Sequence, residues 1–276
     1  MIQSAIHTLP VEWQAWIQEN LARGCTPDSM AMVMVRDGKF DPALAEAAIR
    51  EAGGVQRVTK PRPDIDTSSN TIQTPDRMVH VLLSLAAPRI VLLGNVLSDE
   101  ECDQLCDYVS GKLSRSTVVT DDGAQVQAHA GRTSRGAMLM RGETDLIARV
   151  DARLAALAKW PVENGEGLQV QWYDIGNEYR AHFDWFDPTQ AGPRKHMEHG
   201  GQRVGTFVLY LNDVPQGGGT GFPGLGLEVQ PRKGNAVFFA NTDMFGTPDR
   251  NTLHSGMPVV SGVKVIANKW LRERPY

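Results

Sequence analysis

The chain has 276 residues, with 28 Lys plus Arg against 32 Asp plus Glu, for a formal net charge of −4. Hydrophobic residues make up 41% and charged residues 22%, which is the composition of a folded globular protein and excludes a disordered chain. No long basic run is present, so nucleic acid is not an expected partner. No stretch approaches 18 consecutive apolar residues, so no membrane association is expected.

The cysteines and the N-terminus bear on the compartment. The first residues lack the positive charge and the apolar segment of a signal peptide. Cys25, Cys102 and Cys106 cannot all pair, and Cys102 and Cys106 lie four residues apart on a predicted helix. We expect these thiols to pack in the core; metal binding or redox chemistry is the alternative. We also expect a cytoplasmic protein.

Three regions are predicted along the chain. Residues 1–57 form a small helical region, in which apolar residues recur every three or four positions and Asp41 caps a helix that starts with Pro42. Residues 58–77 are rich in proline, serine and charge without apolar periodicity, and we interpret them as a linker. Residues 78–276 form the main domain. We expect the N-terminal helices to pack or to mediate dimerisation; recruitment of a target protein is the alternative.

The main domain begins with a strand over residues 88–97 and a helix capped by Ser98 with Glu101 at its third position, followed by a helix over residues 143–157. Beyond Pro161 the segments are short, rich in β-forming residues and separated by Gly and Pro. Strands are predicted at residues 168–173, 204–211, 236–239 and 263–270. This pattern favours an α+β fold with a mainly β core, a sandwich or barrel with helices packed before it.

One group of side chains is suited to binding a metal. His182 and Asp184 are two residues apart on a strand, so both side chains point to the same face. His254, on a later β-rich segment, supplies a second imidazole, and two histidines with one carboxylate form the facial triad of non-haem iron enzymes. The motif alone is weak, because His196 and Glu198 repeat the same spacing.

Two further features concern ligand binding. Lys264 lies between apolar residues on a predicted strand, where an ammonium group requires an anionic partner. Residues 219–224 match the spacing of a dinucleotide-binding loop, but Pro223 and the glycines that follow exclude the helix that such a loop must open. We interpret this segment as a tight turn that presents Thr220 inward.

These residues lie in a series of motifs that resembles the prolyl 4-hydroxylase branch of the Fe(II)/2-oxoglutarate dioxygenases. The resemblance extends from about Pro88 to Trp270. Its motifs are Tyr173-Asp174-Ile175-Gly176-Asn177-Glu178-Tyr179-Arg180-Ala181-His182-Phe183-Asp184, Gly200-Gly201-Gln202-Arg203-Val204, Tyr210-Leu211-Asn212-Asp213-Val214, Gly218-Gly219-Thr220-Gly221-Phe222-Pro223, Lys233-Gly234-Asn235-Ala236, Leu253-His254-Ser255-Gly256, and Gly262-Val263-Lys264 through Lys269-Trp270.

The resemblance implies a double-stranded β-helix, or jelly roll, buttressed by helices. It implies Fe(II), 2-oxoglutarate and O2 as cofactor and cosubstrates, with ascorbate as the reductant. Within the motifs, the iron ligands match His182, Asp184 and His254. The 2-oxoglutarate-binding residues match Lys264, whose ammonium pairs with the distal carboxylate, together with Tyr173 and Thr220. The substrate-facing positions match Arg203, Trp270 and Tyr179.

The resemblance has three departures. Val265 and Asn268 replace a Trp and a Thr that are usual in relatives, and residues 194–197 look like an insertion in the loop that closes over the substrate. We expect residues 188–199 to form a mobile loop.

The implied reaction is hydroxylation of a prolyl residue in a peptide or protein, with release of succinate and CO2. Alternatives are a hydroxylase of a free amino acid or small metabolite, and a non-catalytic sensor. The oligomeric state is open, a homodimer being one option.

Overall fold

The computed structural model describes residues 4–53, 59–115, 118–119, 126–127 and 133–276. Contacts divide the chain into two compact units, residues 1–59 and 60–276. None of the helices among the described residues is long and apolar enough to cross a membrane.

The first unit is helical, as the sequence pattern predicts. Its elements are η1 (Ile6–Thr8), α1 (Val11–Ala22), α2 (Pro27–Arg36) and α3 (Pro42–Ala52). Thr26 and Asp41 cap the second and third helices by accepting hydrogen bonds from backbone N–H groups, and each is followed by proline. Ile17 and Met34 are fully buried in a core shared by all three helices, so this unit has an apolar centre of its own.

The predicted linker is wrong from Lys60 onward, because this segment belongs to the second unit. Ile65 is 1% exposed, the N–H of Asp64 donates to the carbonyl of Ala158 at 3.1 Å, and Arg89 bonds to the Asp64 carboxylate at 2.6 Å. Residues 71–73 form a strand. Single contacts of this kind, which attach the segment to the main domain, leave no periodic pattern in the sequence.

A large antiparallel sheet spans the second unit. Its strands, in spatial order, are β1 (Thr71–Gln73), β2 (Met78–Leu85), β3 (Ile90–Gly94), β14 (Ala236–Ala240), β10 (Arg203–Tyr210), β17 (Lys264–Arg272), β8 (Gly165–Tyr173), β7 (Arg135–Leu139) and β4 (Ser114–Arg115). Strands distant in sequence are neighbours in this sheet: Lys264 on β17 pairs with Tyr173 on β8, and Tyr210 on β10 pairs with Ile266.

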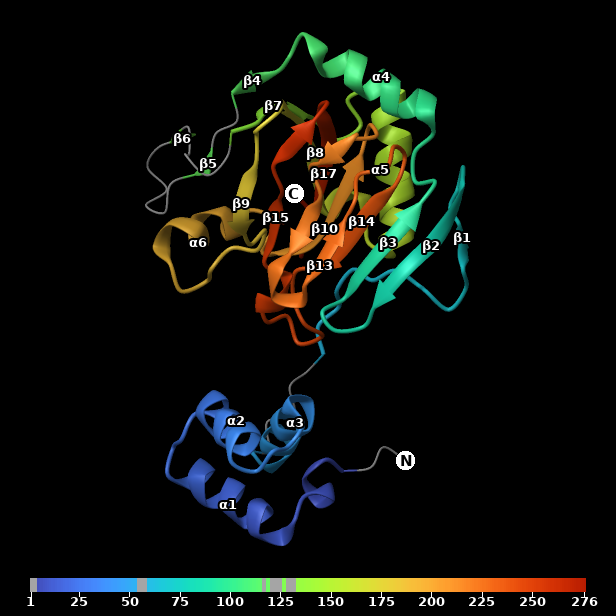
Figure 1. Cartoon of the computed structure of the whole chain (residues 1–276). Helices are drawn as coiled ribbons and strands as arrows, with labels where there is room; N and C mark the ends of the chain where they lie inside the picture. The colour runs from blue at the N-terminus through green and yellow to red at the C-terminus, as the bar shows by residue number, and fades with distance from the viewer. Residues whose placement is uncertain (1–3, 54–58, 116–117, 120–125, 128–132) are drawn as a thin grey trace. The chain divides into compact units, whose positions relative to one another are not determined.

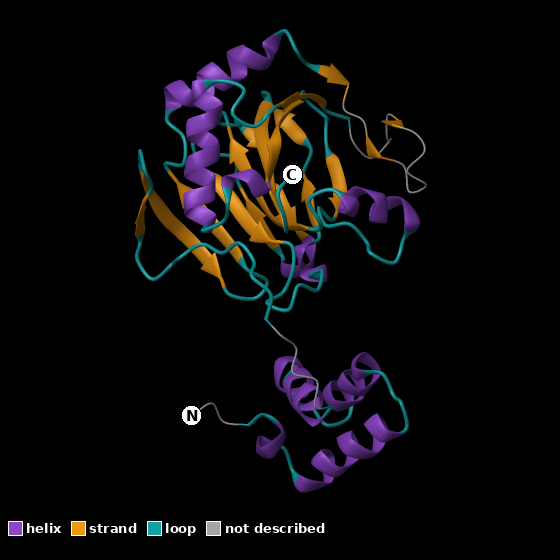
Figure 2. Cartoon of the chain, turned by 180° about the vertical axis from the view of Figure 1, so that it is seen from behind, coloured by secondary structure: helices purple, strands orange, loops and turns teal. Residues whose placement is uncertain are grey.

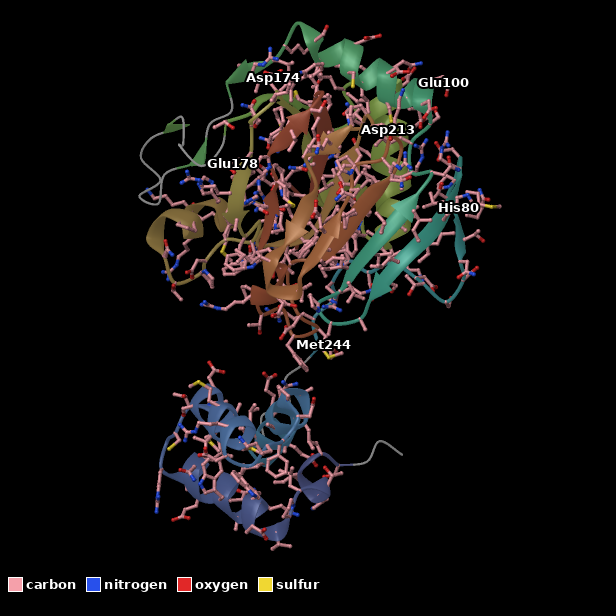
Figure 3. The ribbon with its side chains drawn as sticks, in the orientation of Figure 1. His80, Glu100, Asp174, Glu178, Asp213 and Met244 are labelled. Atoms are coloured by element: carbon pink, nitrogen blue, oxygen red, sulfur yellow. The ribbon has the colours of Figure 1, made fainter. Side chains whose placement is uncertain are left out.

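A smaller sheet faces the large one (Figure 1). Its strands, in order, are β13 (Leu227–Val229), β12 (Thr220–Phe222), β15 (His254–Gly256) and β9 (Tyr179–His182). Two strand pairs complete the set: β11 (Gln216–Gly217) with β16 (Val259–Ser261), and β5 (Val118–Val119) with β6 (Val126–Gln127). Phe222 from the small sheet and Phe239 from the large one meet in a core between the sheets, at a ring separation of 5.5 Å. Side chains fill this interior (Figure 3). The predicted jelly roll is confirmed.

Two helices cover the other face of the large sheet, α4 (Asp99–Ser110) and α5 (Asp145–Ala158), as seen from behind in Figure 2. Ser98 and Glu101 form the predicted capping box. Cys102 is fully buried in this helix–sheet core, and burial raises the pKa of its thiol to about 12, which agrees with a packing role. The described cysteines are all free thiols.

The segment predicted as a mobile loop contains a helix, α6 (Ala191–Glu198). Three short 3-10 turns also occur in this unit, η2 (Val162–Asn164), η3 (Pro223–Leu225) and η4 (Arg250–Thr252). The sequence of α6 carries glycine, proline and charge but little apolar periodicity, so the signal for a helix is weak. Contacts from β17 hold the end of α6, as described below.

Candidate metal centre and cosubstrate pocket

The smaller sheet and the segment after β9 bring His182, Asp184 and His254 together: both histidines lie on paired strands of this sheet, and Asp184 follows the end of β9. His182 ends β9, His254 begins β15, and the two are direct partners in the antiparallel register. Their imidazole rings are 4.4 Å apart between centroids, and one donor atom from each of the three side chains lies within 4.8 Å of the others. Asp184 is 5% exposed and His254 is 5% exposed. We refer to these residues as the His-Asp-His triad.

Two short turns, one before each strand, position the two histidines. A turn between Asp174 and Glu178 (labelled in Figure 3) leads the chain from β8 of the large sheet to β9. Gly176 has φ 78° in this turn, and the side chain of Asn177 accepts a hydrogen bond from the Asp174 N–H at 3.0 Å. Asp249 caps η4 (Arg250–Thr252) by accepting from the Asn251 N–H, and His254 lies two residues after that turn ends.

The imidazoles are oriented so that one nitrogen of each is free to bind a metal. Nδ1 of His182 lies 2.8 Å from the Arg180 carbonyl, and Nδ1 of His254 lies 2.9 Å from the Thr252 carbonyl. A carbonyl only accepts, so both Nδ1 atoms carry the proton and both Nε2 atoms present a lone pair. Each Nε2 is 3.6 Å from a different oxygen of Asp184. This set of two nitrogens and one carboxylate fits Fe(II).

Buried groups behind the triad position Asp184. Its Oδ2 accepts from the Thr206 hydroxyl at 2.9 Å, and that hydroxyl accepts from Asn241 Nδ2 at 3.0 Å. Burial raises the pKa of Asp184, but His254, His182 and Arg203 outweigh this effect, and the pKa lies below its ordinary value. The carboxylate therefore stays ionised, which is the form that binds a cation.

Lys264 lies in the interior next to β15. It is 1% exposed, and a Cβ at Gly256, two residues after His254, would lie 3.8 Å from its Nζ. No carboxylate in the described part of the chain pairs with this ammonium, and burial lowers the pKa of Lys264 to about 7. A buried lysine without a counter-charge is the feature that the sequence predicts for an anion-binding position.

The other two residues predicted to bind 2-oxoglutarate lie near Lys264. The ammonium is 5.4 Å from the ring centre of Tyr173, whose hydroxyl donates to Gln171, and Thr220 is 3% exposed. The Thr220 hydroxyl accepts from Tyr210 at 2.8 Å, so its own proton remains available to a ligand. The structure places Thr220 on β12 rather than in the tight turn itself, which lies just before it.

The glycine run before Thr220 allows the backbone to approach Lys264. Gly218 has φ 69°, and a Cβ there would lie 3.3 Å from Lys264 Cδ. These glycines open no helix, in agreement with the rejection of a dinucleotide-binding loop.

The predicted substrate-facing residues form a wall beside the triad. The Arg203 guanidinium lies 3.8 Å from the Trp270 ring centre, and its Nε and Nη2 bond to the Glu166 carboxylate at 2.7 and 2.9 Å. Tyr179 stacks on the His182 imidazole with ring centres 3.6 Å apart. The structure thus brings Tyr179 into contact with the triad and Arg203 into contact with Trp270, which lies six residues along β17 from Lys264.

Sequence reasoning missed three residues that orient this set: Glu166, Thr206 and Asn241. Glu166 lies between two glycines, Gly165 and Gly167, so it lacks the apolar neighbours that pointed to Lys264. Thr206 and Asn241 carry no such signal, because a buried Thr or Asn in a strand is ordinary.

Comparison with known proteins agrees with this geometry. The model of the 2OG-Fe(II) oxygenase superfamily matches residues 168–272. The chain is 39% identical over 208 residues to probable prolyl 4-hydroxylase 6 of Arabidopsis thaliana, which covers 68% of this chain and 70% of that protein. It is 33% identical over 226 residues to prolyl 4-hydroxylase 2 of the same plant, covering 74% of this chain and 73% of that protein.

Among solved structures, the viral collagen prolyl hydroxylase of Paramecium Bursaria Chlorella virus-1, in its 2OG complex, is similar. The TM-score is 0.53 at 28% identity, covering 66% of this chain and 95% of the viral one. The fold and the triad define a 2-oxoglutarate-dependent dioxygenase of the 2OG-Fe(II) oxygenase superfamily, which implies Fe(II), 2-oxoglutarate and O2. Within that superfamily, the chain belongs to the prolyl 4-hydroxylase family, and the predicted resemblance is confirmed.

Proposed function

We propose that this enzyme hydroxylates a prolyl residue in a peptide or protein, converting 2-oxoglutarate and O2 to succinate and CO2. One oxygen atom of O2 enters the substrate C–H bond and the other enters succinate. The observation that carries the proposal is the His-Asp-His triad, whose histidines lie on paired strands, next to a buried lysine for which the described residues offer no counter-charge. Bound Fe(II) supplies the oxidative chemistry.

The chain's own residues hold the reactants. Nε2 of His182, Nε2 of His254 and the carboxylate of Asp184 would hold the metal. The Lys264 ammonium would pair with the distal carboxylate of 2-oxoglutarate, and the Thr220 hydroxyl would donate to it. Burial of Lys264 excludes water from this ion pair and strengthens it.

The Arg203 wall favours a peptide over a free amino acid. Glu166 accepts hydrogen bonds from Nε and Nη2 of Arg203, and its negative charge balances that of the guanidinium. Nη1 of Arg203 is therefore left to donate to a neutral acceptor such as a peptide carbonyl. A free amino acid would instead present a carboxylate, for which an arginine already paired with a glutamate is a weaker partner. The names of the relatives point to the same substrate class.

The test is turnover of a substrate panel with Fe(II) and 2-oxoglutarate, with and without ascorbate. The panel contains poly(L-proline), proline-containing peptides, free proline and other free amino acids, and succinate and substrate mass are measured. We expect a mass increase of about 16 Da, one oxygen atom, on prolyl residues, with matching succinate. Hydroxylation of free amino acids alone would establish the first alternative, and 2-oxoglutarate binding without any succinate would establish the sensor.

A matched pair of variants controls for the metal. His182→Ala should abolish succinate release. His80→Ala should not, because His80 is an exposed residue of β2, next to the edge strand β1 of the large sheet (Figure 3). Ascorbate dependence, the cytoplasmic location and the oligomeric state stay predictions.

A further inference from the structure

Arg272, the last residue of β17, connects the large sheet to the end of α6. Its guanidinium is 3% exposed. Nη2 donates to the carbonyl of His196 and, at 2.6 Å, to the carbonyl of His199, so one nitrogen binds the last turn of α6 and the residue that follows the helix. A cation at a helix C-terminus is stabilised by the unpaired carbonyls and by the helix dipole.

Because Arg272 shares its one carboxylate partner, it depends on the carbonyl groups at the end of α6 for its other hydrogen bonds. Its Nε is 3.6 Å from Glu166 Oε1, which also accepts from Arg203 at 2.7 Å. The buried Arg272 and the partly buried Arg203 therefore share one carboxylate, and the carbonyls at the end of α6 supply the remaining negative partners of Arg272. The backbone passes close by: Gly200 has φ 76°, and a Cβ there would lie 2.9 Å from Arg272 Nε.

Phe186 links this contact to the active site. It lies two residues after Asp184, and its ring centre is 4.9 Å from the Arg203 guanidinium and 5.1 Å from that of Arg272. The His196 ring of α6 stacks on Phe186 at 5.5 Å. Gln202 fixes the same residue through its backbone, because its amide bonds to both the N–H and the carbonyl of Phe186 at 2.7 Å.

We propose that Arg272 is a positioning residue that holds α6 against the wall formed by Arg203 and Trp270, and that this contact sets the affinity for the peptide substrate. The inference rests on the proposed function for its substrate, but not for the position of α6. Arg272 itself touches neither the triad nor Lys264 among the contacts described, so loss of the contact should spare 2-oxoglutarate turnover in the absence of peptide.

The test compares Arg272→Gln and Arg272→Lys with Arg274→Gln in the full chain. Arg274 is the matched control, because it is exposed and reaches α6 only through a 3.4 Å contact with the Met197 carbonyl. Three quantities are measured: hydrogen exchange of residues 191–199, 2-oxoglutarate turnover without peptide, and the poly(L-proline) concentration at half-maximal stimulation of that turnover.

We expect faster exchange in residues 191–199 and a roughly tenfold or greater rise in the half-maximal poly(L-proline) concentration for Arg272→Gln. Arg272→Lys should show a smaller rise, because an ammonium keeps the charge without the planar fork. The Michaelis constant for 2-oxoglutarate should stay within twofold of wild type.

Unchanged exchange in the Arg272 variants would overturn the proposal, as would equal effects of Arg274→Gln. If poly(L-proline) fails to stimulate the wild-type enzyme, the fault lies with the proposed substrate, and the exchange measurement alone decides the role of Arg272. A general loss of folding in Arg272→Gln would appear as faster exchange in β8 and β10 as well, and Arg272→Lys then decides with the charge retained. The same general loss in Arg272→Lys would overturn the specific role.

Discussion

Lys264 gives the sharpest test of the active-site assignment, because it is buried and no carboxylate in the described part of the chain balances its charge. Burial lowers its pKa from 10.5 to about 7, so charging it inside the folded protein costs about 5 kcal/mol more than in water, at about 1.4 kcal/mol per pKa unit. Lys264→Met removes this cost while keeping an unbranched side chain of similar size. The variant should therefore be more stable than wild type but should bind 2-oxoglutarate poorly.

The pH dependence follows from the sign of the shift. The folded-state pKa lies below the unfolded one, so between pH 7 and pH 10.5 the unfolded chain binds more protons and stability rises with pH. Relative to Lys264→Met, wild type should be less stable by up to about 4 kcal/mol at pH 7 and by about 2 kcal/mol at pH 9. Urea unfolding of both proteins at the two pH values measures this difference, in which other titrating groups cancel.

Cosubstrate binding should move in the opposite direction. The carboxylate of 2-oxoglutarate pairs with the protonated lysine, so the half-saturating concentration should increase as pH rises above 7 in wild type and stay flat in Lys264→Met. At pH 7 the variant should need ten- to a hundredfold more 2-oxoglutarate, corresponding to a charge-assisted hydrogen bond of about 1.5–3 kcal/mol.

Lys269 on the same strand is the matched control. It pairs with Asp151 at 2.6 Å inside the helix–sheet core, so Lys269→Met leaves the buried Asp151 carboxylate without its counter-charge and should destabilise the protein by about 3–5 kcal/mol. If Lys264→Met were destabilising to the same extent, or kept the wild-type requirement for 2-oxoglutarate, Lys264 would be a structural residue and the cosubstrate pocket would lie elsewhere.

Three further predictions concern the metal centre and the domain boundary. Alanine at each position of the His-Asp-His triad should abolish 2-oxoglutarate turnover with circular dichroism unchanged; retained turnover without His254 but not without His196 would refute the triad. Thr206→Val, which removes the 2.9 Å hydrogen bond to Asp184, should weaken Fe(II) binding about ten- to a hundredfold by metal titration, and wild-type affinity would show that this bond is dispensable. Deleting residues 1–57 should leave turnover without peptide intact, since the second unit begins at Lys60; a folded but inactive truncated protein would place the helices in the catalytic domain.

The local elements of the fold were predictable because their signals are local. The capping box at Ser98 and Glu101, the Asp41-Pro42 helix start and the β-rich segments after Pro161 each depend on neighbouring residues. Residues 60–77 and α6 were mispredicted, because their structure depends on distant partners. Ile65 is buried by the main domain, and the end of α6 is bound by Arg272, about 75 residues further along the chain.

The same distinction between local signals and long-range contacts applies to the active site. The sequence by itself determined the reactive groups: a histidine and a carboxylate two residues apart on a strand, a second histidine, and a lysine where no charge is expected. Tertiary structure decided which of these groups meet. Only the pairing of β9 with β15 brings His182 to His254, and only the pairing of β17 with both β10 and β8 places Arg203 between Glu166 and Trp270. Strand register is fixed by contacts between segments tens of residues apart, so a local pattern cannot encode it.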